Sequence, residues 1–188
     1  MERKIITPRF IVVASTIIIV ALCRLIPHPP NFTPVVAMAL FSGAYFTRKI
    51  LAFLIPFFTM LLSDFLLNSF VYPTYQEGYF TSIATFSVYG SFLLIVCIGL
   101  LLSRKLKLLP IALGTLGSSI LFFIITNFGS WISYNMYPHS LSGLATCYAA
   151  AIPFFNNALL GDIFFSALMF GGFYLLQLRF PVLAKARG

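Results

Sequence analysis

Two carboxylates and one arginine interrupt apolar stretches in which charged side chains are rare. Asp64 and Asp162 each lie well inside such a stretch, and Arg24 lies at the end of the first one. A charged group in hydrocarbon is costly, so it usually faces the interior of a helix bundle, where it pairs or binds a ligand. We expect either an Arg24–Asp64 ion pair or a ligand-binding Asp64. For Asp162, with Ser166 one turn further on, a structural hydrogen-bonded carboxyl and a functional one are equally good interpretations.

A polar and aromatic stripe follows in the sequence "TNFGSWISYN". Its members recur at i, i+3, i+4, i+7 and i+8, and they are Asn127, Ser130, Trp131, Tyr134 and Asn135. This spacing places them on one face of a helix. Such a face is unfavourable against lipid, so we predict that it faces a cavity inside the bundle. A position at the membrane surface is the alternative for Trp131 and Tyr134, because these residue types collect there.

Two further amides, Asn156 and Asn157, lie in the sequence "CYAAAIPFFNNALLGD". If their helix begins near Ala149, both lie about two turns below the outer surface. They then share a depth with Asp64 and with the polar stripe. We therefore predict a polar cavity in the outer half of the bundle.

The segment "RLIPHPPNFTP", residues 24–34, contains four prolines within an otherwise apolar region. Proline excludes ordinary helix here and favours turns or extended chain. We predict a stiff lid or rim that packs against the starts of the fourth and sixth helices. Arg24, His28 and Asn31 would then lie over the cavity, and a plain inter-helix turn is the alternative.

The two histidines raise the question of metal chemistry. His28, His139 and Cys147 have the ligand types of a metal site, but ordinary loop histidines are the simpler interpretation. We expect no metal and no cofactor. The sequence contains no HExxH, no GxSxG and no phosphate-cradling glycine loop, so we do not expect an enzyme.

The elements that must position these residues follow from composition. Of 188 residues, 60% are hydrophobic and only 9% are charged, and the mean hydropathy is +0.99. This composition predicts an all-α, polytopic membrane helix bundle that forms a single domain over residues 1–188. We expect six transmembrane spans, of which the second is unusually short: Phe10–Ile26, Phe32–Phe46, Ile50–Phe70, Phe80–Leu102, Leu108–Asn135 and Tyr148–Leu178.

The basic residues predict the orientation of these spans. Arg24 excepted, the twelve lysines and arginines lie before the first span, between the second and third, between the fourth and fifth, or after the sixth. Lysine and arginine are retained on the cytoplasmic side. We therefore expect a bacterial inner-membrane protein with both termini in the cytoplasm. The net charge of +8 is then a topological signal, and nucleic acid is not an expected partner.

Small residues predict where helices approach closely. Ala39 and Gly43 form a small-xxx-small pair on the second span, and Gly114 and Ser118 form another on the fifth. Such pairs allow close packing of helix backbones in membranes.

Four stretches carry a resemblance: "RLIPHPPNFTPVVAMALFSGAYF", "LLSD", "TNFGSWISYNMYP" and "GLATCYAAAIPFFNNALLGD". They resemble a family of uncharacterised bacterial six-helix membrane proteins, common in Bacteroidota and usually labelled as transport proteins. More distantly, the size, the six spans and the cytoplasmic termini are similar to the S components of energy-coupling-factor vitamin transporters. That resemblance implies a ligand in the outer half of the bundle, beneath extracytoplasmic loops.

We therefore expect a membrane transport component that binds a small polar or aromatic, vitamin-like nutrient. Its partners would be that small molecule, membrane lipid and an energy-coupling module, because the chain has no nucleotide-binding motif of its own. The alternative is a non-transporting assembly or scaffold protein in which the polar residues only hold helices together. The expected ligand-binding residues are Arg24, His28, Asn31, Asp64, Asn127, Ser130, Trp131, Tyr134, His139, Asn156 and Asn157.

Overall fold

The computed structural model describes residues 6–71, 81–103 and 106–184, and the regular structure in these ranges is entirely helical. The elements are α1 (Pro8–Leu22), η1 (Cys23–Leu25), α2 (Val35–Tyr45), α3 (Lys49–Leu66), η2 (Leu67–Val71), α4 (Ile83–Leu102), α5 (Leu108–Ser133), α6 (Leu141–Ser166), η5 (Ala167–Gly171), α7 (Gly172–Arg179) and η6 (Pro181–Leu183).

Five helical segments are long and apolar enough to cross a membrane. They are Pro8–Leu25, Lys49–Val71, Ile83–Leu102, Leu108–Ser133 and Leu141–Arg179. The remaining expected span is α2, which has only 11 residues. At about 1.5 Å per residue it covers roughly 16 Å, about half of the hydrocarbon thickness. The predictions of an all-helical fold with several helices long and apolar enough to cross a membrane, and of a short second helix, are confirmed.

The short helix α2 lies in the centre of the bundle. Every residue from Val35 to Tyr45 is buried, which is unusual for a helix of a membrane protein because lipid normally covers one face. A Cβ on Gly43 would overlap the Val96 carbonyl of α4, and a Cβ on Gly99 would overlap the Leu40 carbonyl of α2. The two glycines thus allow the backbones of α2 and α4 to touch, as the small-residue pattern predicts for Gly43.

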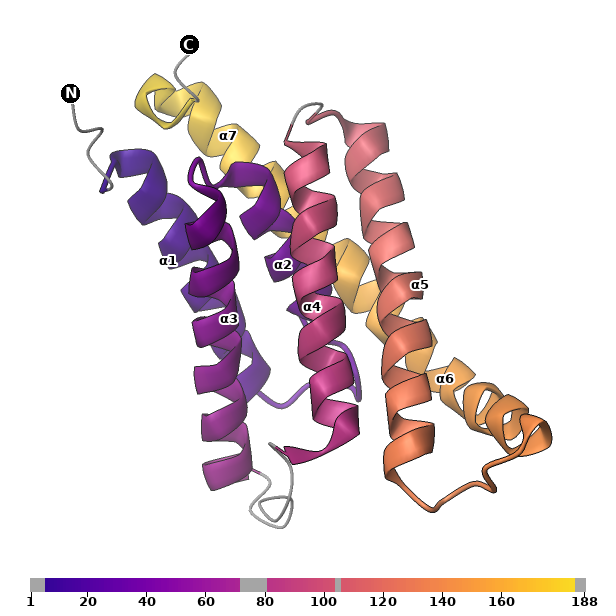
Figure 1. Ribbon diagram of the computed structural model, residues 1–188. Coiled ribbons are helices and arrows are strands. Elements are labelled where there is room, and N and C mark those ends of the chain that lie inside the picture. Colours follow the sequence, from indigo (N-terminus) through magenta and orange to yellow (C-terminus); the bar gives the residue numbers. More distant parts are fainter. Residues whose placement is uncertain (1–5, 72–80, 104–105, 185–188) are drawn as a thin grey trace.

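Both termini lie at the same end of the bundle (Figure 1), which we call the terminal end. The connection from α2 to α3, the end of α4 and the start of α5 lie there too, whereas the connections from α1 to α2 and from α5 to α6 lie at the opposite, far end (Figure 1). Basic residues collect at the terminal end because Arg9, Arg48, Lys49, Lys107 and Arg179 all lie at or beyond the helix ends that meet there. Figure 1 therefore agrees with the up-and-down connectivity that the charge pattern predicts.

The last span differs most from the sequence prediction. It begins at Leu141 rather than Tyr148, because Ser140 caps it by accepting a hydrogen bond from the Gly143 N–H at 3.2 Å. Pro153 lies inside the helix and does not start it. The continuous segment through η5 and α7 runs obliquely behind the other helices, and its first turns diverge from the bundle at the far end (Figure 1).

The segment 24–34 forms a turn that packs on α6. The Phe32 N–H donates to the Pro29 carbonyl at 3.0 Å, and Asn31 has a φ of 64°, which together describe a type II turn with Pro30 and Asn31 at its centre. The Phe32 ring lies 5.8 Å from that of Phe164, centroid to centroid. The segment therefore lies against the last turns of α6, which ends at Ser166, and the expected contact with the start of that helix is wrong. The longer α6 places its first turns farther out.

Candidate functional site

Arg24 and Asp64 form a buried ion pair between η1 and α3. Nη2 of Arg24 lies 2.6 Å from Oδ1 of Asp64, and the side chains are 11% and 1% exposed. The Tyr89 hydroxyl donates to Oδ2 of Asp64 at 2.7 Å, and Arg24 also donates to the Ser63 hydroxyl. Neither member of the pair lines the cavity described next. Of the two interpretations that the sequence left open, this geometry agrees with an internal pair that joins helices.

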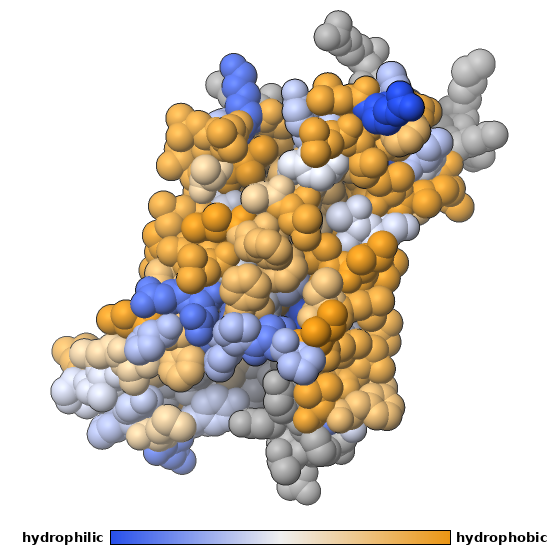
Figure 2. Space-filling view, turned by 180° about the vertical axis from the view of Figure 1, so that it is seen from behind, coloured by the Kyte–Doolittle hydropathy of each residue, from blue (hydrophilic) through white to orange (hydrophobic). Residues whose placement is uncertain are grey.

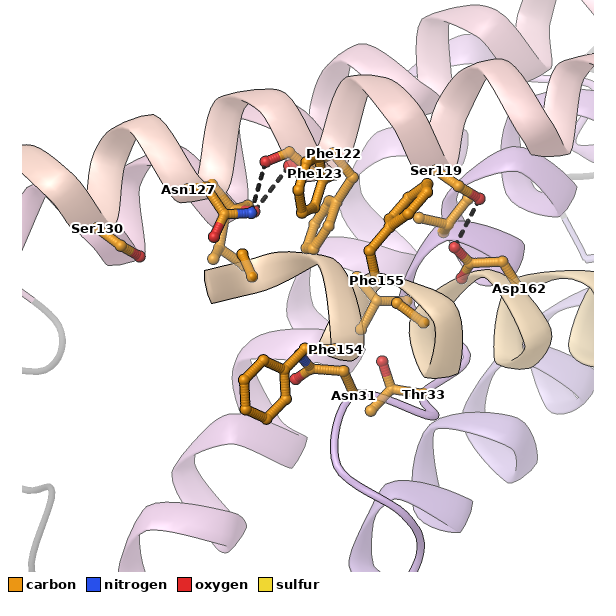
Figure 3. Close-up of a pocket in the computed structure, with 16 residues that line it drawn as sticks. Asn31, Thr33, Ser119, Phe122, Phe123, Asn127, Ser130, Phe154, Phe155 and Asp162 are labelled. Carbon is orange, nitrogen blue, oxygen red and sulfur yellow. Dashed lines mark hydrogen bonds between the residues drawn. The ribbon is translucent and has the colours of Figure 1, made fainter. Parts of the chain in front are cut away.

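A cavity of about 300 Å³ lies in the half of the bundle away from the termini. It is enclosed by the start of α2 and the turn before it, by α4, by the second half of α5 and by α6 (Figure 3). Its lining residues are Asn31, Thr33, Val35, Val36, Val88, Ser119, Phe122, Phe123, Thr126, Asn127, Ser130, Ala151, Phe154, Phe155, Ala158 and Asp162.

Aromatic rings form much of the cavity wall. Phe122 and Phe123 come from α5, and Phe154 and Phe155 come from α6. The rings of Phe123 and Phe155 lie 4.7 Å apart, centroid to centroid, so they bridge the two helices. Phe154 lies beside Asn31 on the opposite side of α6 from α5 (Figure 3). These rings offer flat apolar surface to any molecule in the cavity.

Asp162 lies at the inner end of this cavity. Its side chain is 4% exposed, and Oδ2 accepts a hydrogen bond from the Ser119 hydroxyl at 2.7 Å (Figure 3). One turn deeper, the Thr115 hydroxyl donates to the Ser166 hydroxyl at 3.1 Å. Between the structural and functional interpretations of Asp162, its position in the cavity wall favours a functional one.

Three of the residues expected from sequence meet in the cavity wall: Asn31, Asn127 and Ser130. Nδ2 of Asn127 donates to the Phe123 carbonyl one turn earlier, at 2.8 Å. That bond fixes the amide and directs its oxygen away from its own helix. Positive φ is accessible to asparagine, which explains how Asn31 can occupy the turn and still face the cavity.

Trp131 and His139 have a different environment from the expected one. The Trp131 indole N–H donates to the Pro138 carbonyl at 3.0 Å, and Nε2 of His139 lies 3.1 Å from the Trp131 carbonyl. Their rings pack edge to face with centroids 5.2 Å apart. They close the connection between α5 and α6 and do not line the cavity.

The other expected residues also lie outside the cavity lining. Tyr134 follows the end of α5 at Ser133 and is 50% exposed, so the polar stripe is one turn shorter than predicted. Asn156 is exposed and Asn157 half-buried, because α6 starts seven residues early and changes their depth. His28 faces its own loop, with Nδ1 3.1 Å from the Pro29 carbonyl. Among the described residues, histidine, cysteine and carboxylate side chains form no group of three that could hold a metal.

Sequence reasoning missed Ser119, Asp162 and the four phenylalanines as cavity residues. A signal for Ser119 exists, because it precedes Asn127 by eight residues and therefore continues the polar stripe inward by two turns. No comparable signal identifies the phenylalanines, since 22 residues of the chain are phenylalanine.

A second cavity, of about 450 Å³, lies at the terminal end between Arg9, the end of α2 and the end of α4. The Arg9 guanidinium donates to the backbone carbonyls of Tyr45, at 3.1 and 3.2 Å, and Leu183, at 2.9 Å. It also lies 5.5 Å from the Tyr45 ring centroid. Because these contacts use the guanidinium to join three parts of the chain, we interpret Arg9 as a structural residue.

The model of a protein family described as "Family of unknown function (DUF6580)" matches residues 4–183. The chain belongs to this family. The match takes in every described helix of the DUF6580 chain, including both sides of the cavity and the Arg24–Asp64 pair. Comparison with curated proteins and with solved structures finds no match in either set.

Proposed function

We propose that this DUF6580 protein is a membrane transport component that binds a small ligand in the cavity between α2, α4, α5 and α6. One observation carries the proposal: a cavity of about 300 Å³ combines four aromatic rings with fixed polar groups in the half of the bundle away from the termini. Sites for small molecules usually have this composition, with apolar walls for affinity and a few polar groups for orientation.

The polar groups lie on different sides of the cavity, as recognition of one molecule requires. Asn31 and Thr33 come from the turn before α2, Asn127 and Ser130 from α5, and Asp162 from α6. A flat or aromatic ligand could stack on the phenylalanines while these groups bind its polar atoms.

The charge pattern supports an outward-facing site. If lysine and arginine mark the cytoplasmic side, the terminal end is cytoplasmic and the cavity lies in the outer half of a bacterial inner membrane. Seen from behind, hydrophilic surface interrupts the apolar face beside the first turns of α6 (Figure 2), which supports access to the cavity from that side. We propose that the protein works as an S component does, with an energy-coupling module as its partner.

Filling the cavity tests this function. In an Ala158→Phe variant the new ring would occupy cavity space, whereas Gly117→Phe on α5 adds the same ring where a Cβ meets nothing within 4 Å. We expect native mass spectrometry and solvent extraction to recover a small molecule from the wild type and from Gly117→Phe, and much less of it from Ala158→Phe. Equal amounts in all three proteins, or none in the wild type, would contradict the proposal.

One observation favours the scaffold alternative. Arg24 and Asp64, which lie within the spans, form an ion pair with each other, and neither lines the cavity. A protein that only joined helices would use its buried charges in this way. The same extraction experiment separates the two functions, because a scaffold retains no specific small molecule.

A further inference from the structure

The two carboxylates inside the spans have opposite electrostatic surroundings. Asp64 has a guanidinium 2.6 Å away and a tyrosine hydroxyl on its second oxygen. Asp162 has one neutral donor, the Ser119 hydroxyl, and no lysine, arginine or histidine of the described ranges pairs with it. Among the described residues, no side chain therefore balances a negative charge on Asp162.

Within the part of the chain that the structure describes, Asp162 is also the only charged residue in the cavity lining. The turn before α2 contributes Asn31 and Thr33, α2 contributes Val35 and Val36, and α4 contributes Val88, all of them uncharged. The N-terminus of α2 carries a partial positive charge equivalent to roughly half a unit. It offsets only part of the charge of an ionised Asp162, so the cavity has a negative potential when this carboxyl is ionised.

A buried carboxylate keeps its charge only when a partner balances it, and because Asp162 lines the cavity, that partner would reach it through the cavity. Hard metal cations take six or more oxygen ligands, but only the Asp162 carboxylate and the Ser119 hydroxyl are joined at this point. The aromatic rings of Phe122, Phe123 and Phe155 lie in the same wall. Aromatic faces attract organic cations, and a carboxylate among them strengthens that preference.

We propose, building on the proposed function, that the ligand is a small organic cation whose positively charged nitrogen pairs with Asp162. The phenylalanine rings would surround the apolar part next to that nitrogen, and the amides of Asn31 and Asn127 would bind the opposite end of the molecule. The cavity volume of about 300 Å³ lies at the lower limit for ligand sites and restricts the ligand to a small molecule.

Charge-selective labelling of a cavity cysteine tests this proposal without knowledge of the ligand. The full chain, with Cys23, Cys97 and Cys147 replaced by alanine, receives Ala158→Cys, which lies one helical turn, about 6 Å, from Asp162. Two methanethiosulfonate reagents of similar size are compared, one with a trimethylammonium group and one with a sulfonate group. Mass spectrometry gives each labelling rate, which is divided by the rate of the same reagent with a small free thiol.

We expect the cationic reagent to react at least about tenfold faster than the anionic one. At about 6 Å a unit charge changes the local concentration of each reagent roughly threefold even with the dielectric constant of water, in opposite directions for the two signs. When Asp162→Asn is added to the Ala158→Cys variant, the ratio of the cationic to the anionic labelling rate should fall close to one. A second variant, Ser130→Cys, keeps Asp162 and places the thiol about 16 Å from Ser119 along α5. Its ratio of cationic to anionic labelling rates should be smaller than that of Ala158→Cys. This comparison does not need Asp162→Asn, so it remains valid even if that variant fails to fold.

The outcomes separate this inference from the proposed function. A ratio near one at Ala158→Cys, a ratio that Asp162→Asn leaves unchanged, or equal ratios at the two cysteine positions would overturn the cationic ligand while leaving an accessible cavity. Absence of labelling by both reagents at both positions would show that the cavity is closed to solution, and both proposals would then be wrong.

Discussion

The contact between α2 and α4 predicts a large effect for a single methyl group. In a Gly99→Ala variant the Cβ would lie 3.0 Å from Cα of Gly43 and 3.1 Å from the Leu40 carbonyl carbon, and it would overlap the Leu40 carbonyl oxygen. Ordinary contacts of this kind begin at 3.4 Å. All three neighbours are backbone atoms of a fully buried helix, so none of them can rotate away, and the helices must separate.

The magnitude follows from the packing that this separation removes. Overpacking of a tight core costs about 1–3 kcal/mol, and we expect the upper part of that range because the clash is with backbone. For a chain of this size each kcal/mol corresponds to roughly 2–4 °C in the unfolding temperature. Gly99→Ala should therefore unfold roughly 6–12 °C below the wild type.

Gly90→Ala is the matched control for this measurement. It makes the same substitution in the same helix, at a position where a Cβ meets nothing within 4 Å, so its unfolding temperature should equal or slightly exceed that of the wild type. The assay is thermal unfolding of each purified protein in the same detergent, followed by intrinsic fluorescence. Equal unfolding temperatures for the two alanine variants would refute the close approach of α2 and α4.

Two further predictions use the same assay. Asp64→Asn should cost about 3–5 kcal/mol because it leaves the Arg24 guanidinium buried without a counter-charge, and the double variant Arg24→Met with Asp64→Leu should recover much of that loss; a double variant as unstable as the single one would contradict this reasoning. Asn31→Gly should change stability by less than about 0.5 kcal/mol, whereas Asn31→Val should cost about 1–2 kcal/mol because its φ of 64° is strained for a β-branched residue; equal stability of the two variants would show that the turn does not need this conformation.

The sequence was most informative where a single residue carries a large energetic cost. A charge in hydrocarbon is costly, so an Arg24–Asp64 pair could be expected from their depths as one of two interpretations, beside a ligand-binding Asp64. The short second helix could be predicted because Arg48 and Lys49 limit its length. Gly43 could be identified as a packing residue from the small-residue pattern.

Features that depend on the relative positions of helices could not be predicted in the same way. The early start of α6 depends on a cap at Ser140 that apolar periodicity does not reveal. Trp131 lies on the same helical stripe as Asn127, yet its indole N–H donates to the Pro138 carbonyl in the loop that follows α5. The path of that loop, which brings Pro138 back to Trp131, is not visible in the spacing of the stripe. The cavity itself arises from the divergence of α6 from the bundle, which no pattern within one segment encodes.

The complete burial of α2 has a consequence for how the protein is made. An apolar segment normally leaves the insertion machinery because its surface is compatible with lipid, but a helix of roughly 16 Å is too short to span the hydrocarbon and stay there alone. Its close partner Gly99 lies more than fifty residues later in the chain. We therefore expect that α1 and α2 do not reach their final packing while the chain is being synthesised. The helix α2 should take its final position only after α4 has entered the membrane.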